Sequence, residues 1–152
     1  LRREVSTGYS VSAEEIERMV AELNSSSRVF KATGGIHSAA IFQNSRMVAF
    51  SEDVGRHNAV DKVVGASILK DVDFARSVLV TSGRQTADIV AKAAQMGIPI
   101  SASISGPIHS GIRLAEKAGL TLVCFARGRR FNIYTSPERI KLPGETQTET
   151  KS

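Results

Sequence analysis

The sequence predicts an α/β fold in which helices cover a sheet. From residue 77 to residue 126, short apolar runs alternate with amphipathic segments, as they do in strand–helix–strand units. The chain has 152 residues, 41% of them hydrophobic and 23% charged, which is the balance of one ordinary globular domain. We therefore expect a single domain over residues 1–142 and a disordered polar tail over residues 143–152.

The first predicted element is an amphipathic helix over residues 12–25. Ser12 and Glu15 form an S-x-x-E capping box, in which each side chain bonds a backbone N–H of the other residue. Apolar residues then recur at i, i+3, i+4 and i+7 from Ile16, so one face of this helix should be buried.

A hairpin and a second helix follow. Short apolar runs at residues 38–42 and 47–51 flank a polar turn, which is the pattern of two neighbouring strands. Helical spacing returns over residues 58–69, and we expect Asn58 to be its N-cap.

The remaining elements alternate regularly. Glycines at positions 97 and 119 should end the two helices of this region. We expect strands at 77–81, 98–103, 120–126 and 131–134, and helices at 86–96 and 110–118. Such alternation favours a largely parallel sheet, and the short basic connection before residue 131 favours an antiparallel hairpin at its edge.

Composition limits the classes of function. A net charge of +5 favours anionic partners. Cys124 is the one cysteine, so the chain can build neither an internal disulfide nor a four-cysteine zinc site, and we expect no zinc. Since no apolar run reaches the ~18 residues of a membrane span, we expect a soluble, cytoplasmic protein without membrane contact.

Candidate ligand-binding residues lie at three loops beside strand ends, where backbone N–H groups and helix N-termini face anions. The first loop contains Thr33, Gly34, Gly35 and His37; the second contains Asp53, Gly55, Arg56, His57 and Asn58; the third contains Ser82, Gly83 and Arg84. Each loop also has a simpler interpretation: a Gly-Gly turn with a surface histidine, helix capping with surface ion pairs, or an ordinary turn.

The second loop carries the most chemistry. Arg56 could hold a phosphate bidentately, and Asp53 could orient His57 or accept a ligand hydroxyl. The third loop is no P-loop, because the G-x-x-x-x-G-K-[ST] spacing is absent. The serine-rich segment 103–107 could add backbone donors to the same site or simply form a turn.

Three further features carry less weight as evidence of function. The arginines at positions 127, 129 and 130 either bind a ligand or keep a hairpin turn solvated. Nucleic-acid binding is disfavoured because aromatic residues make up only 5% of the chain, so few side chains are available for bases to stack on. Cys124 lies in an apolar run and should be a buried, unreactive thiol.

Taken together, these segments resemble the FdhD/NarQ family. The likeness rests on T-G-G-I-H at 33–37, E-D-V-G-R-H-N-A-V-D-K-V-V-G at 52–65, T-S-G-R at 81–84, A-G-L-T-L-V at 118–123 and F-A-R-G-R-R-F-N-I-Y-T at 125–135. It covers about residues 11–140 of the chain.

The resemblance implies a three-layer α/β/α, cytidine deaminase-like fold with a mixed sheet, and a homodimer. It implies a formate dehydrogenase maturation factor that binds the molybdenum bis-guanine-dinucleotide cofactor and supports sulfur transfer to it from a cysteine desulfurase. The twelve candidate residues would then surround one polyanionic ligand. Deaminase chemistry is not implied, since the H-x-E and P-C-x-x-C zinc motifs are absent.

One departure from the family pattern concerns sulfur. Family members carry a C-x-x-C segment upstream of the matched region, and these 152 residues contain none. Because sulfur relay needs a nucleophilic thiolate, we expect the chain to be the cofactor-binding body of a longer protein. The alternative is a non-catalytic cofactor chaperone or adaptor without persulfide chemistry.

Overall fold

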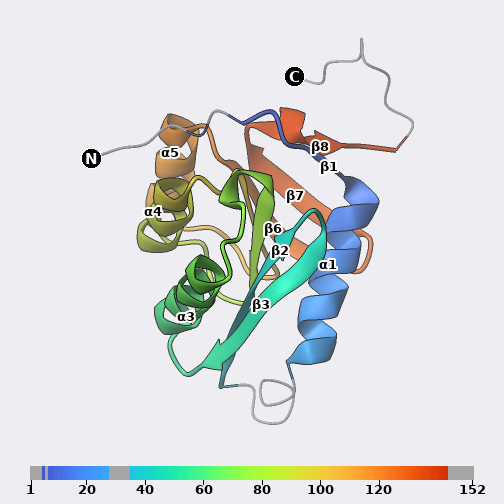
Figure 1. The fold of residues 1–152 in the computed structure, drawn as a ribbon. Helices are drawn as coiled ribbons and strands as arrows, with labels where there is room; N and C mark the ends of the chain where they lie inside the picture. Colours follow the sequence, from blue (N-terminus) through green and yellow to red (C-terminus); the bar gives the residue numbers. More distant parts are fainter. Residues whose placement is uncertain (1–4, 6, 28–34, 144–152) are drawn as a thin grey trace.

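The structure, a computed structural model, describes residues 5, 7–27 and 35–143 (Figure 1). Thr33 and Gly34 of the first candidate loop lie outside these residues. The predicted tail, apart from Pro143, also lies outside them, so both expectations stay predictions.

A six-stranded mixed sheet forms the centre of the molecule, in the order β3-β2-β4-β5-β6-β7. The strands are β2 (His37–Gln43), β3 (Arg46–Asp53), β4 (Ser77–Thr81), β5 (Ile100–Ser103), β6 (Thr121–Arg127) and β7 (Arg130–Thr135). The strands β4, β5 and β6 are parallel, and the β2–β3 and β6–β7 hairpins are antiparallel, as predicted.

The prediction of a largely parallel sheet holds for β4, β5 and β6 but is wrong for the half of the sheet that contains β2 and β3. The strand β2 lies between β3 and β4 and runs antiparallel to both. The reason is the helix α3 (Arg56–Leu69), which connects β3 to β4 as a crossover that passes over β2.

Helices cover both faces of the sheet, which confirms the three-layer α/β/α arrangement. The remaining long helices are α1 (Ala13–Ser26), α4 (Ala87–Met96) and α5 (His109–Ala118). The helix α1 lies on one face, and α3, α4 and α5 lie on the other (Figure 1). Short pieces complete the fold: β1 (Val11–Ser12) pairs with β8 (Ile140–Lys141), and 3₁₀ turns span Phe74–Arg76 and Pro137–Arg139.

The capping box predicted for α1 is confirmed. The Ser12 hydroxyl accepts a hydrogen bond from the Glu15 N–H at 3.1 Å, and the Glu15 carboxylate accepts one from the Ser12 N–H at 2.8 Å. The helices α4 and α5 end, as predicted, at Gly97 and Gly119, whose φ angles of 82° and 73° suit glycine.

The predicted start of α3 is wrong. The helix begins at Arg56 with Gly55 as N-cap, and no side chain among the described residues caps it. Asn58 therefore lies inside the first turn, where its side-chain amide contacts the Asp53 carboxylate at 3.4 Å. The Asp53 side chain already accepts the Gly55 N–H at 3.0 Å, so the chain turns before residue 58.

Two buried clusters hold the layers together. Val60, Leu79 and Ile89 belong to the cluster between the sheet and α3, α4 and α5, whereas Ile16 and Phe42 belong to the cluster beneath α1. Burial of such side chains supplies most of the stabilisation of a domain of this size. Each helix in the described part is too short or too polar to cross a membrane.

Candidate functional site

The described residues of all three candidate loops lie at one edge of the sheet, which we name the carboxyl rim. It is the edge at which β3, β4, β5 and β6 end and β2 begins, since His37 pairs with Asp53 and β2 runs antiparallel to β4. Ligands of open α/β sheets bind outside the carboxyl ends of the strands. The topology therefore gathers at one rim residues that lie as far apart in the chain as Gly35 and Arg84.

His37 and Ser82 meet at the centre of the carboxyl rim. The Ser82 hydroxyl accepts the Ser38 N–H at 2.9 Å and lies 3.3 Å from Nδ1 of His37. The Ser82 N–H donates to the Ser38 carbonyl at 2.9 Å, so the third loop is fixed to the start of β2. Burial, followed by the charge of Arg56, lowers the pKa of His37 and favours its neutral form.

Arg56 packs against the third loop. An added Cβ on Gly83 would lie 2.8 Å from Cβ and 2.9 Å from Cδ of Arg56, so glycine is needed for this close approach. Nε of Arg56 is buried and has no hydrogen-bond partner within the described part of the chain. A buried polar atom without a partner is costly, and Oε2 of Glu52 and Oγ of Ser67 share this property within the described residues. Of the three, Nε of Arg56 belongs to the side chain that packs against the third loop.

Asp53 belongs to a separate ion pair beside this centre. Lys62 lies 2.8 Å from its carboxylate, and the Gly55 N–H donates to it. The hydrogen bond from Lys62, then that from Gly55, lowers the pKa of Asp53 to about 2. The suggestion that Asp53 orients His57 is therefore wrong, because its carboxylate is directed to Lys62 and the turn before α3.

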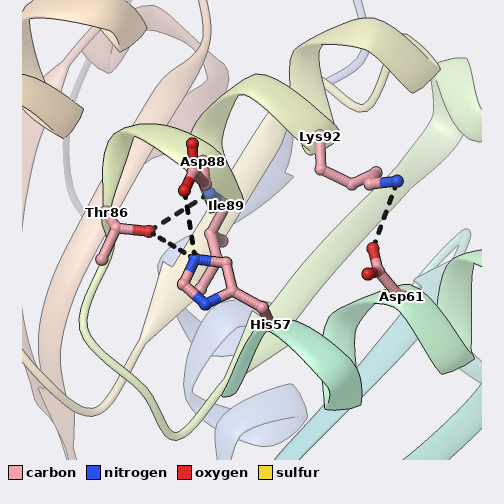
Figure 2. Close-up of polar contacts among 6 residues, drawn as sticks. All are labelled: His57, Asp61, Thr86, Asp88, Ile89 and Lys92. Atoms are coloured by element: carbon pink, nitrogen blue, oxygen red, sulfur yellow. Dashed lines mark hydrogen bonds and ion pairs between the residues drawn. The ribbon is translucent and has the colours of Figure 1, made fainter. Parts of the chain in front are cut away.

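His57 instead joins the N-termini of α3 and α4. Its Nε2 lies 3.3 Å from the hydroxyl of Thr86, the N-cap of α4, and 3.7 Å from the Asp88 carboxylate (Figure 2). Further along the same two helices, Lys92 lies 3.2 Å from Asp61 (Figure 2). An open groove of about 150 Å³ runs between these pairs. His57 thus ties the two helices together beside the site.

The serine-rich segment after β5 braces the third loop. The Ser105 hydroxyl donates to the Ser82 carbonyl at 2.7 Å, and the Ser103 hydroxyl donates to the Gly83 carbonyl. The N–H groups of Ser105 and Ile104 are bonded to the Ser103 hydroxyl and the Thr81 carbonyl, so neither is available to a ligand. This brace supplies hydrogen-bond donors to two carbonyl oxygens of the third loop.

Other candidate residues lie further out. Gly35 and Arg84 are exposed at the rim, and the arginines at 127, 129 and 130 are exposed in the β6–β7 turn. Cys124 is fully buried, as predicted, and burial raises the pKa of its thiol to about 12. Within the described residues, no three His, Cys, Asp or Glu side chains gather in a way that could hold a metal ion.

Sequence reasoning missed one residue of the rim. The apolar run containing Phe125 predicted a buried strand, but Phe125 is 47% exposed. Its N–H donates to the Ser105 carbonyl at 3.0 Å, so it adjoins the brace of the third loop. The strand β6 continues past Phe125 to Arg127, so the apolar pattern alone gave no signal that this side chain is exposed.

Comparison with known proteins identifies relatives over nearly the whole chain. A model of the FdhD/NarQ family matches residues 1–141. The sulfur carrier protein FdhD of Thermoplasma acidophilum is 46% identical over 137 residues, which are 90% of this chain and 49% of that protein. The protein of the same name from Sulfolobus acidocaldarius is 49% identical over 133 residues, 86% of this chain and 53% of the relative. The chain thus spans about half the length of these curated relatives.

Solved structures agree with the fold. A crystal structure of a candidate formate dehydrogenase accessory protein from Desulfotalea psychrophila matches with a TM-score of 0.81 and 40% identity, covering 88% of this chain and 60% of that chain. The guanine deaminase of Nitrosomonas europaea matches with a TM-score of 0.58 at 13% identity, covering 84% of this chain and 82% of the other. At that identity the likeness concerns the fold alone, and it confirms the expected deaminase-like architecture.

Proposed function

Because the chain belongs to the FdhD/NarQ family, we propose that it is the cofactor-binding body of a formate dehydrogenase maturation factor. Its ligand is the molybdenum bis-guanine-dinucleotide cofactor, held as a client and passed to formate dehydrogenase. The observation that carries this proposal is Arg56, whose buried Nε finds no acceptor among the described residues.

The chemistry of Arg56 suits a phosphate. Guanidinium groups pair with phosphate oxygens through two parallel hydrogen bonds, and such charge-assisted bonds are stronger than neutral ones. The stem of Arg56 is held against Gly83, which limits the freedom lost when a ligand binds. A phosphate placed here supplies the acceptor that Nε lacks.

Neighbouring groups add donors for the same anion. The helix α3 starts without a side-chain cap, so the N–H groups of its first turn are available and carry the positive end of the helix dipole. The Ser82 hydroxyl and the imidazole of His37 lie beside Arg56 on the carboxyl rim. A ligand with several phosphates matches this set of separate donors better than a single small anion does.

The proposed sulfur transfer from a cysteine desulfurase needs a thiol other than Cys124. A sulfur carrier works through an accessible thiolate, whereas Cys124 is buried in β6 with a pKa of about 12. The same observation favours the second candidate function, a cofactor chaperone or adaptor without persulfide chemistry. Persulfide labelling of this chain after incubation with a desulfurase and cysteine tests the inertness of Cys124 on which both arguments depend, and a label on Cys124 would contradict it.

Cofactor binding can be tested with guanosine diphosphate (GDP), which represents one end of the cofactor. We expect Arg56→Ala to weaken GDP binding about 10- to 100-fold in calorimetry, the effect of losing a charge-assisted contact of ~1.5–3 kcal/mol. The matched control is Arg113→Ala, which removes an exposed arginine from α5 and should leave the affinity unchanged. Equal affinities of the Arg56 variant and the unmodified chain would exclude Arg56 from the site.

Homodimerisation stays part of the proposal. Sedimentation of the chain with and without GDP measures its oligomeric state, and a monomer in both conditions would contradict the proposed homodimer.

A further inference from the structure

Phe125 occupies an unusual backbone position. In the β6–β7 ladder, Cys124 pairs with Asn132 and Arg127 pairs with Arg130, so two residues of β6 stand opposite one residue of β7. This is a β-bulge, and Phe125 is its first residue, with φ at +57°. Bulky side chains rarely adopt positive φ, and where they do the strain is often tied to function.

The bulge takes Phe125 out of the alternation of β6. Cys124 faces the cluster beneath α3, α4 and α5, and Ala126 faces the cluster beneath α1. Phe125 between them joins neither cluster and is 47% exposed. The backbone strain therefore places an aromatic ring in solvent at the carboxyl rim rather than in the core.

The exposed ring is also positioned by its neighbours. An added Cβ on Gly106 would collide with the Phe125 ring, so the ring lies directly on this glycine. The Phe125 N–H bonds the Ser105 carbonyl, and the Ser105 hydroxyl bonds the Ser82 carbonyl. Two hydrogen bonds thus connect Phe125, through Ser105, to the third loop, against which Arg56 packs.

We propose that Phe125 is the stacking platform for a purine base of a nucleotide whose phosphate is held at Arg56. This inference rests on the proposed function and adds the residue that takes the base. Aromatic faces bind bases of any sequence by stacking. Among the large hydrophobic residues exposed in the described part of the chain, Phe125 is the one aromatic, the others being Val54, Ile68, Leu69 and Leu142.

The test uses two variants of the whole chain. Phe125→Gly removes the ring and keeps the bulge, because glycine adopts positive φ without strain. Phe125→Trp keeps an aromatic face and introduces the one tryptophan of a chain that otherwise has none. Leu69→Ala is the matched control, since Leu69 is an exposed apolar residue at the end of α3.

Calorimetry with GDP and with inorganic pyrophosphate separates the base from the phosphates. We expect Phe125→Gly to weaken GDP binding about tenfold or more and to leave pyrophosphate binding unchanged. Phe125→Trp should retain GDP binding, and GDP but not pyrophosphate should quench its tryptophan fluorescence. The Leu69 variant should bind both ligands like the unmodified chain.

Other outcomes overturn the assignment. Unchanged GDP affinity in Phe125→Gly, or no quenching by bound GDP in Phe125→Trp, shows that the base lies elsewhere. Equal loss of GDP and pyrophosphate in Phe125→Gly shows that the ring only braces the third loop. If the unmodified chain binds neither ligand, the proposed function itself fails, which is a distinct result from a GDP site that requires Arg56 but not Phe125.

Discussion

Replacing Gly83 by alanine tests the packing on which the proposed anion site depends. The φ of Gly83 is not positive, so alanine suits the backbone, and the cost comes from the contact with Arg56. The new Cβ would lie 2.8 Å from Cβ of Arg56, about 0.6 Å closer than an ordinary van der Waals contact. Since Cβ of Arg56 is fixed by the helix backbone, either α3 or the third loop must shift.

The size of the effect follows from this overlap. Overpacking of this kind costs about 1–3 kcal/mol of the free energy of unfolding, which is roughly 2–10 °C in Tm for a chain of this size. A shift of the third loop would also disturb the hydrogen bonds between Ser82 and β2. We therefore expect Gly83→Ala to lower both the Tm and the affinity for GDP.

A double-mutant cycle tests whether the contact with Arg56 causes the loss of stability in Gly83→Ala. Arg56→Gly removes every Arg56 atom that an alanine Cβ at position 83 would meet. The Tm loss of Gly83→Ala should therefore shrink in that background, with a coupling energy of about 1 kcal/mol or more. Circular dichroism melts of the four proteins measure it. An equal loss in both backgrounds would refute the close packing of Arg56 on Gly83.

Two further predictions concern stability. Gly65→Ala should raise the free energy of unfolding by about 0.5–1 kcal/mol, because Gly65 is an exposed residue of α3 with open space around its Cα and alanine is the better helix former; a lower Tm for this variant would contradict the geometry of α3. His37 has a folded-state pKa below its ordinary value near 6.5, through burial and then Arg56, so the unfolded chain binds its proton more readily. Stability should accordingly fall as the pH drops below about 6.5, and urea unfolding at pH 5.5 and 7.5 should show a smaller fall in His37→Gln; an identical pH dependence in both proteins would exclude this histidine as the cause.

Local patterns in the sequence predicted most elements because those elements depend on neighbouring residues. The capping box of Ser12 and Glu15 acts within one helical turn, and the glycines at 97 and 119 end their helices through their own φ angles. The N-cap at Asn58 was wrong because a contact within the turn, from Asp53 to the Gly55 N–H, starts α3 earlier. The antiparallel place of β2 was missed because strand order depends on contacts far apart in the chain.

The sequence by itself determined the residue types available at the rim, which are arginines, residues with hydroxyl groups, glycines and histidines. Only the tertiary structure decided which of them meet. It placed His37 beside Ser82 and Arg56 on Gly83, directed Asp53 to Lys62, and turned His57 toward Thr86. It also exposed Phe125, because a bulge is a mismatch between two strands and is encoded in neither strand alone.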